Sequence, residues 1–245
     1  AVTLTPAEHR RVVEITVEQA RGRVPVVAGA GSNDTAKAVA LSKEMKAAGA
    51  THLLHVSPMY NKPPQRGIIA HFEKIADATD LPIIVYNVPG RTGSNIEAKT
   101  TLALAKVQNV VAVKEASGNM AQILDILRDC PEQFSVLSGD DEMTLGILAA
   151  GGHGVISVVS NATPKKMAQL CDVSSRGDFD TARQLHFELL PWMRAAFVES
   201  NPMPVKAAMA MLGKMENRLR LPLVALDEKH AEAVRKALQH AGALR

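Results

Sequence analysis

Lys114 is the residue of this 245-residue sequence whose surroundings most favour covalent chemistry. It stands near the end of the apolar run VVAVKEA, which begins at Val110 and is typical of a buried strand. Side chains alternate along a strand, so Lys114 shares a face with Val110 and Ala112. Poor hydration on such a face lowers the pKa of a lysine and favours the neutral amine that attacks a carbonyl. The alternatives are a lysine that extends to solvent and a buried ion pair with Glu115.

The two tyrosines of the chain both precede Asn at expected strand ends, in MYN and VYN. The hydroxyl of Tyr86 could move a proton in imine chemistry, although a core tyrosine with a satisfied hydroxyl would give the same pattern. Tyr60 lies in the loop SPMYNKPP, whose prolines would hold its ring in place, as in an ordinary stiff surface connection. Arg91 follows Pro-Gly and could bind a carboxylate as a bidentate fork, unless it is simply a solvated loop arginine.

Other polar patterns do not indicate a cofactor or a metal. The sequence GGHG at residues 151–154 lacks the spacing of a phosphate-binding loop and suits a tight turn instead. His52 and His55 are three residues apart on an expected strand and therefore face opposite sides, so they cannot share a metal ion. We therefore expect neither a metal site nor a cofactor.

Strands and helices alternate along the first 160 residues. We expect strands at 24–30, 52–56, 81–88, 110–116, 134–138 and 155–159, and helices at 34–48, 68–78, 97–105 and 122–128. A further helix runs through Leu148, with Asp140 and Asp141 as its predicted cap. Apolar strands at this spacing predict a parallel sheet covered by helices. In a barrel of this kind the chemical groups lie at the carboxyl ends of the strands.

From Thr163 onward the pattern is helical, over 164–173, 179–198, 202–212 and 227–241. This predicts a barrel part at 1–160 and a helical domain at 161–245. The opening residues Thr5-Pro6-Ala7-Glu8 form a capping box, so a helix begins the chain with no strand before it. Six strands alone would suit an open doubly wound sheet. A helix at the start instead fits an α/β (β/α)8 TIM barrel without its first two strands.

The composition of the chain argues against several classes of protein and partner. Hydrophobic residues make up 47% of the chain, and the formal net charge is only +3, without a basic block. This argues against nucleic acid as a partner. Cys130 and Cys171 are too few for a disulfide framework and suit reduced thiols in a cytoplasmic protein. No apolar run reaches the ~20 residues of a membrane helix, and no signal peptide is visible, so we expect no membrane partner.

Taken together, the segments YNVPGRTG, VVAVKEASGN, SPMYNKPP, LSGDD and GGHGVISV resemble the dihydrodipicolinate synthase family over essentially the whole chain. The helical segment FVESNPMPVKAAM is also family-like. The resemblance implies a lyase that condenses pyruvate with L-aspartate 4-semialdehyde in the lysine and diaminopimelate pathway. It also implies a homo-oligomer, either a tight dimer or a tetramer built from such dimers.

The resemblance also implies roles for individual residues. Lys114 would form the Schiff base with pyruvate, and Tyr86 would donate and accept protons. Tyr60 would belong to a proton relay that reaches across a dimer interface. Arg91 would bind the carboxylate of the semialdehyde. Ile156, through its backbone, and Gly139 of LSGDD would line the substrate pocket.

Two departures from the family pattern are expected to matter. The family opens with a strand, a helix and a second strand that ends in a GTTGE motif, and none of these is found in this sequence. A threonine of that motif links the two tyrosines of the relay. Feedback inhibition by lysine in bacterial relatives uses polar groups at a dimer interface, which His9 and Asn33 match. Pro6, Lys37 and Met59 depart from that pattern, and a cation at Lys37 would repel the ammonium groups of lysine, so we expect weak or no inhibition.

Three hypotheses follow from the sequence. The first is the condensation of pyruvate with aspartate semialdehyde through an imine at Lys114. The second is a related pyruvate lyase that acts on a sugar acid, although such lyases usually lack an arginine at the place of Arg91. The third is a truncated, non-catalytic member of the family. We favour the first hypothesis.

Overall fold

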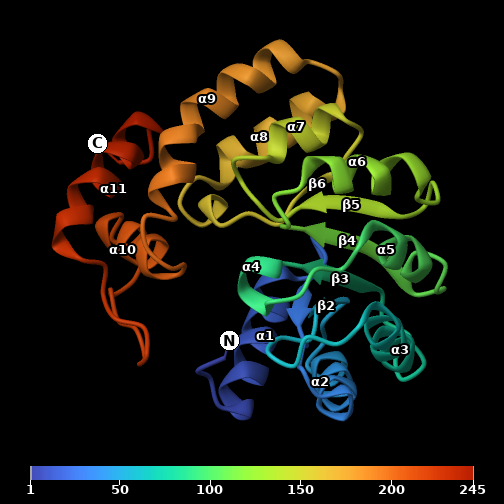
Figure 1. The fold of residues 1–245 in the computed structure, drawn as a ribbon. Coiled ribbons are helices and arrows are strands. Elements are labelled where there is room, and N and C mark those ends of the chain that lie inside the picture. Colours follow the sequence, from blue (N-terminus) through green and yellow to red (C-terminus); the bar gives the residue numbers. More distant parts are fainter. Residues whose placement is uncertain (1, 245) are drawn as a thin grey trace. The chain divides into compact units, whose positions relative to one another are not determined.

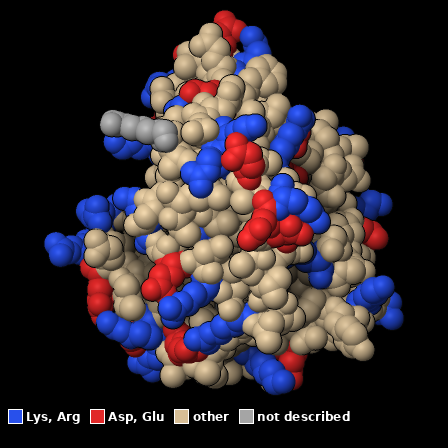
Figure 2. All heavy atoms as spheres, turned by 90° about the vertical axis from the view of Figure 1, so that its left-hand side faces the viewer, with Lys and Arg blue, Asp and Glu red and all other residues tan. Residues whose placement is uncertain are grey.

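The computed structural model describes residues 2–244, which form two compact units. The division falls between Gly139 and Asp140, and each unit is described by itself. The boundary predicted near residue 160 between barrel and helical domain stays a prediction. Among the described residues, no helix is both long enough and apolar enough to cross a membrane. Figure 2 shows basic and acidic side chains interspersed over the face that it draws, without an extended area of one sign.

The first unit is an alternation of strands and helices. Its five strands pair in parallel in the order β1-β2-β3-β4-β5. Figure 1 shows α2, α3, α5 and α6 along one side of this sheet. The elements are α1 Pro6–Ala20, β1 Val27–Gly29, α2 Thr35–Ala47, β2 His52–Val56, α3 Gln65–Ala76, β3 Ile83–Asn87, α4 Pro89–Thr92, α5 Ala98–Leu104, β4 Val110–Glu115, α6 Met120–Asp129 and β5 Ser135–Ser138.

Local sequence explains where these elements start. Thr5 caps α1, and a reciprocal hydrogen bond with Glu8 completes the predicted capping box. Asp34 caps α2 and Asn119 caps α6, because each side chain accepts a hydrogen bond from the first turn of its helix. The first strand is shorter than the predicted 24–30 and covers only Val27–Gly29.

The register of the sheet separates two faces. Val85 of β3, Val113 of β4 and Val136 of β5 are paired in one row and are fully buried, as expected for the side covered by helices. One residue further along, Tyr86 pairs with Lys114 and therefore lies on the opposite side. The pairing of β3 and β4 thus places a phenol and an amine side by side at the carboxyl ends of their strands.

The second unit is mostly helical. Its elements are α7 Thr144–Ala149, β6 Gly154–Val155, the 3-10 turn Val159–Asn161, α8 Pro164–Ser175, α9 Phe179–Ala195, α10 Met203–Met211 and α11 Glu228–His240. Helix α9 packs against α8 and α11 (Figure 1). Trp192 is fully buried in this core, and its Nε1 donates to the carbonyl of Val159 at 3.2 Å. The predicted helices 164–173, 179–198, 202–212 and 227–241 are confirmed to within a few residues.

Two predictions for the second unit are wrong. The last strand covers only Gly154–Val155 rather than 155–159, and a 3-10 turn begins at Val159. Neither Asp140 nor Asp141 caps α7, whose N-cap is Met143 without a side-chain hydrogen bond. The side chain of Asp141 is engaged elsewhere, because its Oδ2 accepts the amides of Val158 and Val159 at 2.9 and 3.3 Å. These amides are therefore not available to extend a strand ladder.

Candidate active site

Lys114 and Tyr86 form the centre of the candidate site. Lys114 is the fifth residue of β4 and only 9% exposed. Its Nζ lies 4.0 Å from the centroid of the Tyr86 ring. The amine is thus held at the carboxyl end of a strand, largely removed from water, and against an aromatic face that attracts its charged form. This geometry suits an amine that must be both retained in place and able to react with a carbonyl.

Gly139 lies against this lysine. A Cβ at position 139 would come within 3.0 Å of Cε of Lys114 and within 2.8 Å of Cβ of Ala116. The amide of Gly139 also donates to the carbonyl of Glu115 at 2.7 Å. The loop after β5 can therefore approach the lysine only because residue 139 has no side chain. Gly139 thus lies beside Lys114, and its predicted role in lining the substrate pocket stays a prediction.

A mostly apolar cavity of ≈ 330 Å³ opens beside Tyr86. Burial raises the pKa of the Tyr86 phenol, and the positive charge of Arg91 opposes this shift. The phenol is therefore protonated at neutral pH and able to donate a proton. Most of the cavity wall could not be identified from the sequence, because glycines and aliphatic side chains carry no chemical signal. The cavity is lined by Val2, His9, Gly29, Gly31, Leu41, Leu54, Val56, Met59 and Tyr86.

Arg91 and Tyr60 lie on connected segments near the end of β3. Arg91 is exposed on the short helix α4, so its guanidinium is accessible to a carboxylate. The amide of Tyr60 donates to the carbonyl of Thr92 at 3.2 Å, which ties the Pro-rich loop to α4. Tyr60 is 89% exposed, and its backbone is left-handed with φ 73°. The loop backbone of Tyr60 is thus fixed within this unit, while its ring points outward.

Glu115 does not lie on the same side of β4 as Lys114, although a buried ion pair between the two was one alternative considered from the sequence. Alternation along β4 puts it on the helix-covered side, opposite to Lys114, where it is 1% exposed. Its carboxylate accepts hydrogen bonds from Asn87 Nδ2 at 2.5 Å and from Ser117 Oγ at 2.6 Å. Burial raises the pKa of Glu115, while these hydrogen bonds oppose the rise. The pairs YN and KE place a polar residue after each reactive one, but this signal does not identify the partners of Glu115.

Ile156 belongs to the second unit, where it directly follows β6 and is half-buried. The next residues are held by Asp141, a 2% exposed carboxylate. Burial raises the pKa of Asp141, and hydrogen bonds from Ser157, Val158 and Val159 oppose this rise. The main chain around Ile156 is therefore fixed from within its own unit.

Of the residues considered for a lysine site, His9 and Met59 line the cavity. Asn33 Nδ2 donates to the carbonyl of Met59 at 3.2 Å, and Asn61 Nδ2 donates back to the carbonyl of Asn33 at 3.0 Å. Pro6 and Lys37 are exposed. Asn33 and Met59 are thus in contact, and the lysine site stays a prediction.

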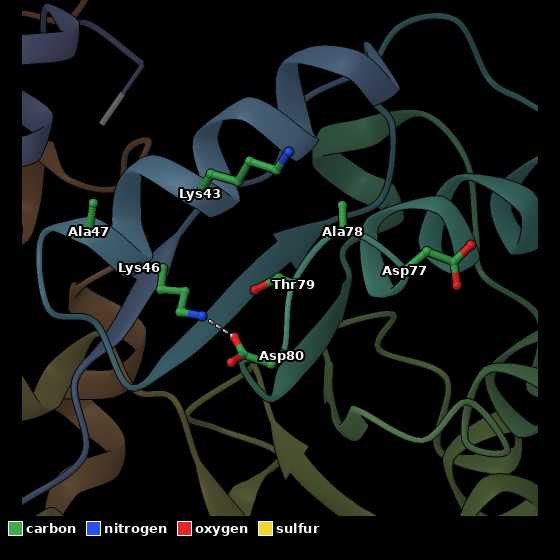
Figure 3. Close-up of a pocket in the computed structure, with 7 residues that line it drawn as sticks. All are labelled: Lys43, Lys46, Ala47, Asp77, Ala78, Thr79 and Asp80. Atoms are coloured by element: carbon green, nitrogen blue, oxygen red, sulfur yellow. Dashed lines mark hydrogen bonds and ion pairs between the residues drawn. The ribbon is translucent and has the colours of Figure 1, made fainter.

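A second hollow of ≈ 650 Å³ lies at the other end of the strands, between the end of α2 and the segment before β3 (Figure 3). Its charges are partly paired, since Lys46 Nζ lies 2.6 Å from Asp80 Oδ1. The amino ends of the strands are not where barrel enzymes place their reactive groups. Among the described residues, no group of three or more His, Cys, Asp or Glu side chains could hold a metal ion.

Comparison with known proteins identifies the relatives of this chain. The model of the dihydrodipicolinate synthetase family matches residues 1–241. A 4-hydroxy-tetrahydrodipicolinate synthase from Syntrophobacter fumaroxidans is 51% identical over 243 residues, which are 99% of this chain and 84% of that relative. The crystal structure of dihydrodipicolinate synthase from Thermotoga maritima matches with a TM-score of 0.97 and 44% identity, over 99% of this chain and 83% of that one.

A third relative was solved with a ligand. The chloride-inhibited dihydrodipicolinate synthase from Acinetobacter baumannii, complexed with pyruvate, matches with a TM-score of 0.97 and 38% identity. That match covers 99% of this chain and 84% of the other. These likenesses confirm the predicted α/β fold of the TIM-barrel type. From the family model and the close relatives together, this chain belongs to the dihydrodipicolinate synthetase family.

Proposed function

We propose that this chain is a 4-hydroxy-tetrahydrodipicolinate synthase, which condenses pyruvate with L-aspartate 4-semialdehyde through a Schiff base at Lys114. The observation that carries the proposal is the buried amine of Lys114 at the end of β4, 4.0 Å from the Tyr86 ring. Membership of the family supports the same substrates, and a relative has been solved with pyruvate.

The proposed chemistry uses the neutral amine first. Nζ of Lys114 adds to the keto carbon of pyruvate, and loss of water from the adduct gives an imine. Loss of a proton from the methyl carbon then gives an enamine, whose carbon bonds to the aldehyde carbon of the second substrate. Tyr86 is proposed as the group that donates and accepts these protons, since its phenol is protonated and lies beside the amine.

The remaining site residues are proposed to bind and orient. Arg91 would hold the carboxylate of the semialdehyde, for which its exposed guanidinium is suited. The main chain at Ile156 and the bare backbone at Gly139 would line the pyruvate pocket. Tyr60 would pass protons to Tyr86 from a neighbouring copy, which the exposure of Tyr60 supports.

Trapping with borohydride tests the proposal directly. Reduction in the presence of pyruvate should attach one reduced pyruvyl group to Lys114, located by peptide mass spectrometry. The variant Lys114→Ala should show no adduct and no turnover, whereas Lys43→Met, at an exposed lysine of α2, should behave like the native chain. A folded native protein that forms no adduct contradicts the proposal. Cleavage of a sugar acid faster than condensation of the semialdehyde would replace the substrate assignment.

We further propose a homo-oligomer that acts in the cytoplasm. An exposed aromatic ring such as that of Tyr60 is typical of a surface that another chain covers. Cys130 and Cys171 are both free thiols, which suits a reducing compartment. Light scattering of the native chain and of Tyr60→Ala tests the assembly, since the substitution should shift the equilibrium toward the monomer.

A further inference from the structure

The last pair of the β3–β4 ladder consists of two buried polar residues. Tyr86 pairs with Lys114, and the next pair is Asn87 with Glu115. Because side chains alternate along both strands, the reactive pair lies on one side of the sheet and the polar pair on the other. Asn87 is fully buried and Glu115 is 1% exposed. Each of the two reactive residues is thus followed by a residue anchored on the opposite side of the sheet.

Glu115 is bonded through both of its carboxylate oxygens. Oε1 accepts from Asn87 Nδ2 at 2.5 Å and, at a longer 3.5 Å, from Gln122 Nε2 of α6. Oε2 accepts from Ser117 Oγ at 2.6 Å. The carboxylate therefore connects β4 to β3, to α6 and to the turn that follows its own strand.

Asn87 extends the network to the segment before α5. Its Oδ1 accepts the amide of Ile96 at 2.9 Å, and its Nδ2 also lies 2.8 Å from Asn95 Oδ1. Gln122 closes the network, because its Oε1 accepts from Asn95 Nδ2 at 2.7 Å and its Nε2 donates to the carbonyl of Ile96 at 3.1 Å. Side chains from β3, β4, the 95–96 segment and α6 are thus joined in one buried network.

The network lies at the carboxyl ends of β3 and β4, where the two strands would otherwise separate. Beyond the Asn87–Glu115 pair, the amide of Ala116 donates to the carbonyl of Asn87 at 2.9 Å and joins the two segments once more. The chain then turns into α4 at Pro89 after β3, and toward α6 after β4. Strand ends fray unless other contacts hold them.

We propose that Glu115 and Asn87 are positioning residues: their buried hydrogen bonds hold the ends of β3 and β4 together and so fix Lys114 against Tyr86. This inference rests on the proposed function, since it concerns the pair that would carry the imine chemistry. A buried carboxylate is costly unless it is fully bonded, and a fully bonded polar network favours one arrangement over its alternatives. Displacements of about 1 Å between reacting groups can slow a reaction by about a hundredfold.

The test compares the rate of imine formation in matched variants. Glu115→Leu removes every acceptor of the carboxylate, and the borohydride-trapped adduct at saturating pyruvate should form about thirtyfold more slowly. Glu115→Gln keeps the acceptor for Asn87, and Ser117 can turn its hydroxyl to accept from the new amide, so the rate should stay within about threefold. The pyruvate concentration for half-maximal rate should change by less than about twofold in both variants.

Asn109→Ala is the control for lost stability. Its side chain donates to the carbonyls of Ala76 and Thr79 at 3.2 and 2.8 Å, at the amino end of the same strand β4. It should destabilise the unit without slowing adduct formation by more than about twofold. If Glu115→Leu does not fold, Ser117→Ala removes a single hydrogen bond from Oε2 and should slow the adduct by about threefold.

The outcomes separate this inference from the proposed function. Suppose that the native chain forms the adduct and that Glu115→Leu forms it as fast as Asn109→Ala does. This result overturns the positioning role alone. A Glu115→Gln variant as slow as Glu115→Leu also overturns it, because charge rather than hydrogen bonding would then be the cause. Unchanged kinetics in Ser117→Ala count against it in the same way. A native chain without any adduct overturns the proposed function, and this inference with it.

Discussion

Two buried polar clusters lie on the helix-covered side of the sheet in the first unit, and they differ in how completely their groups are paired. In the Glu115 cluster, both carboxylate oxygens have donors, and the amides of Asn87 and Gln122 are bonded on both of their ends. In the second cluster, His55 of β2 and His71 of α3 are buried with one nitrogen each lacking a partner among the described residues.

The histidine cluster has its own limited contacts. His55 Nε2 lies 3.2 Å from Ser42 Oγ, and His71 Nδ1 lies 2.9 Å from Thr35 Oγ1. His55 Nδ1 and His71 Nε2 have no hydrogen-bond partner in the described part of the chain. A fully hydrogen-bonded polar cluster favours one geometry. A buried histidine with an unpaired nitrogen can instead change the stability of the fold when it takes up a proton. We therefore expect perturbations near Glu115 to change chemistry and perturbations near His55 to change stability with pH.

The largest effect on chemistry is expected from Tyr86→Phe. The phenylalanine keeps the ring against Lys114 but removes the hydroxyl, so turnover should fall by about a hundredfold while the urea midpoint stays unchanged. Steady-state assays and urea titrations of the same sample measure both quantities. Turnover within a few-fold of the native value would show that another group moves the protons.

The histidine cluster should instead give an acid-sensitive stability. Burial first, and the neighbouring His71 second, lower the pKa of His55 from 6.5 to about 4. Between these values the unfolded chain binds a proton that the folded chain does not bind. Stability is therefore complete above pH 6.5 and falls by about 3 kcal/mol as the pH decreases to 4.

Denaturant titrations at several pH values check this expectation. His55→Leu should reduce the loss of stability between pH 6.5 and 4 and leave adduct formation at neutral pH unchanged. Ser42→Ala is the matched control, because it removes the hydroxyl that contacts His55 but no titrating group. It should change the stability at every pH by a similar amount. A native chain whose stability is flat over this range contradicts the assigned role of His55.

The positions of Lys114 and Tyr86 were easier to predict from the sequence than the contacts of the groups around them. These two residues could be placed near strand ends because reactive residue types stand out in apolar strands and because parallel strands end at one edge of the sheet. Gly139 was identified only through the resemblance of LSGDD to the family. The Glu115 network could not be located, since its partners Asn95 and Gln122 come from separate segments whose contact depends on tertiary packing. Asp141 was misassigned for the same reason. The sequence does not distinguish an aspartate that caps a helix from one that accepts hydrogen bonds from a loop distant in the chain.

A smaller effect is expected at Arg91, which is outside both clusters. Arg91→Ala should raise the semialdehyde concentration for half-maximal rate by about tenfold, because a charge-assisted hydrogen bond to the carboxylate is lost. The rate of adduct formation with pyruvate alone should not change. Arg66→Ala, at an exposed arginine of α3, is the control. Equal effects of the two substitutions would mean that Arg91 contributes only its charge to the surface.

The smallest effect is expected from added L-lysine, at the residues beside the cavity. The side chain of Asn33 is bonded to the carbonyl of Met59, and His9 lines the mostly apolar cavity. Lys37 is exposed on α2, three residues after the cap Asp34, and its positive charge would repel the two ammonium groups of the ligand. Turnover at micromolar lysine should therefore stay within the error of the assay, and Lys37→Glu should make the enzyme more sensitive. Strong inhibition of the native chain at micromolar lysine would mean that the cation at position 37 does not control binding, and that the cavity beside Tyr86 communicates with the β3–β4 pair.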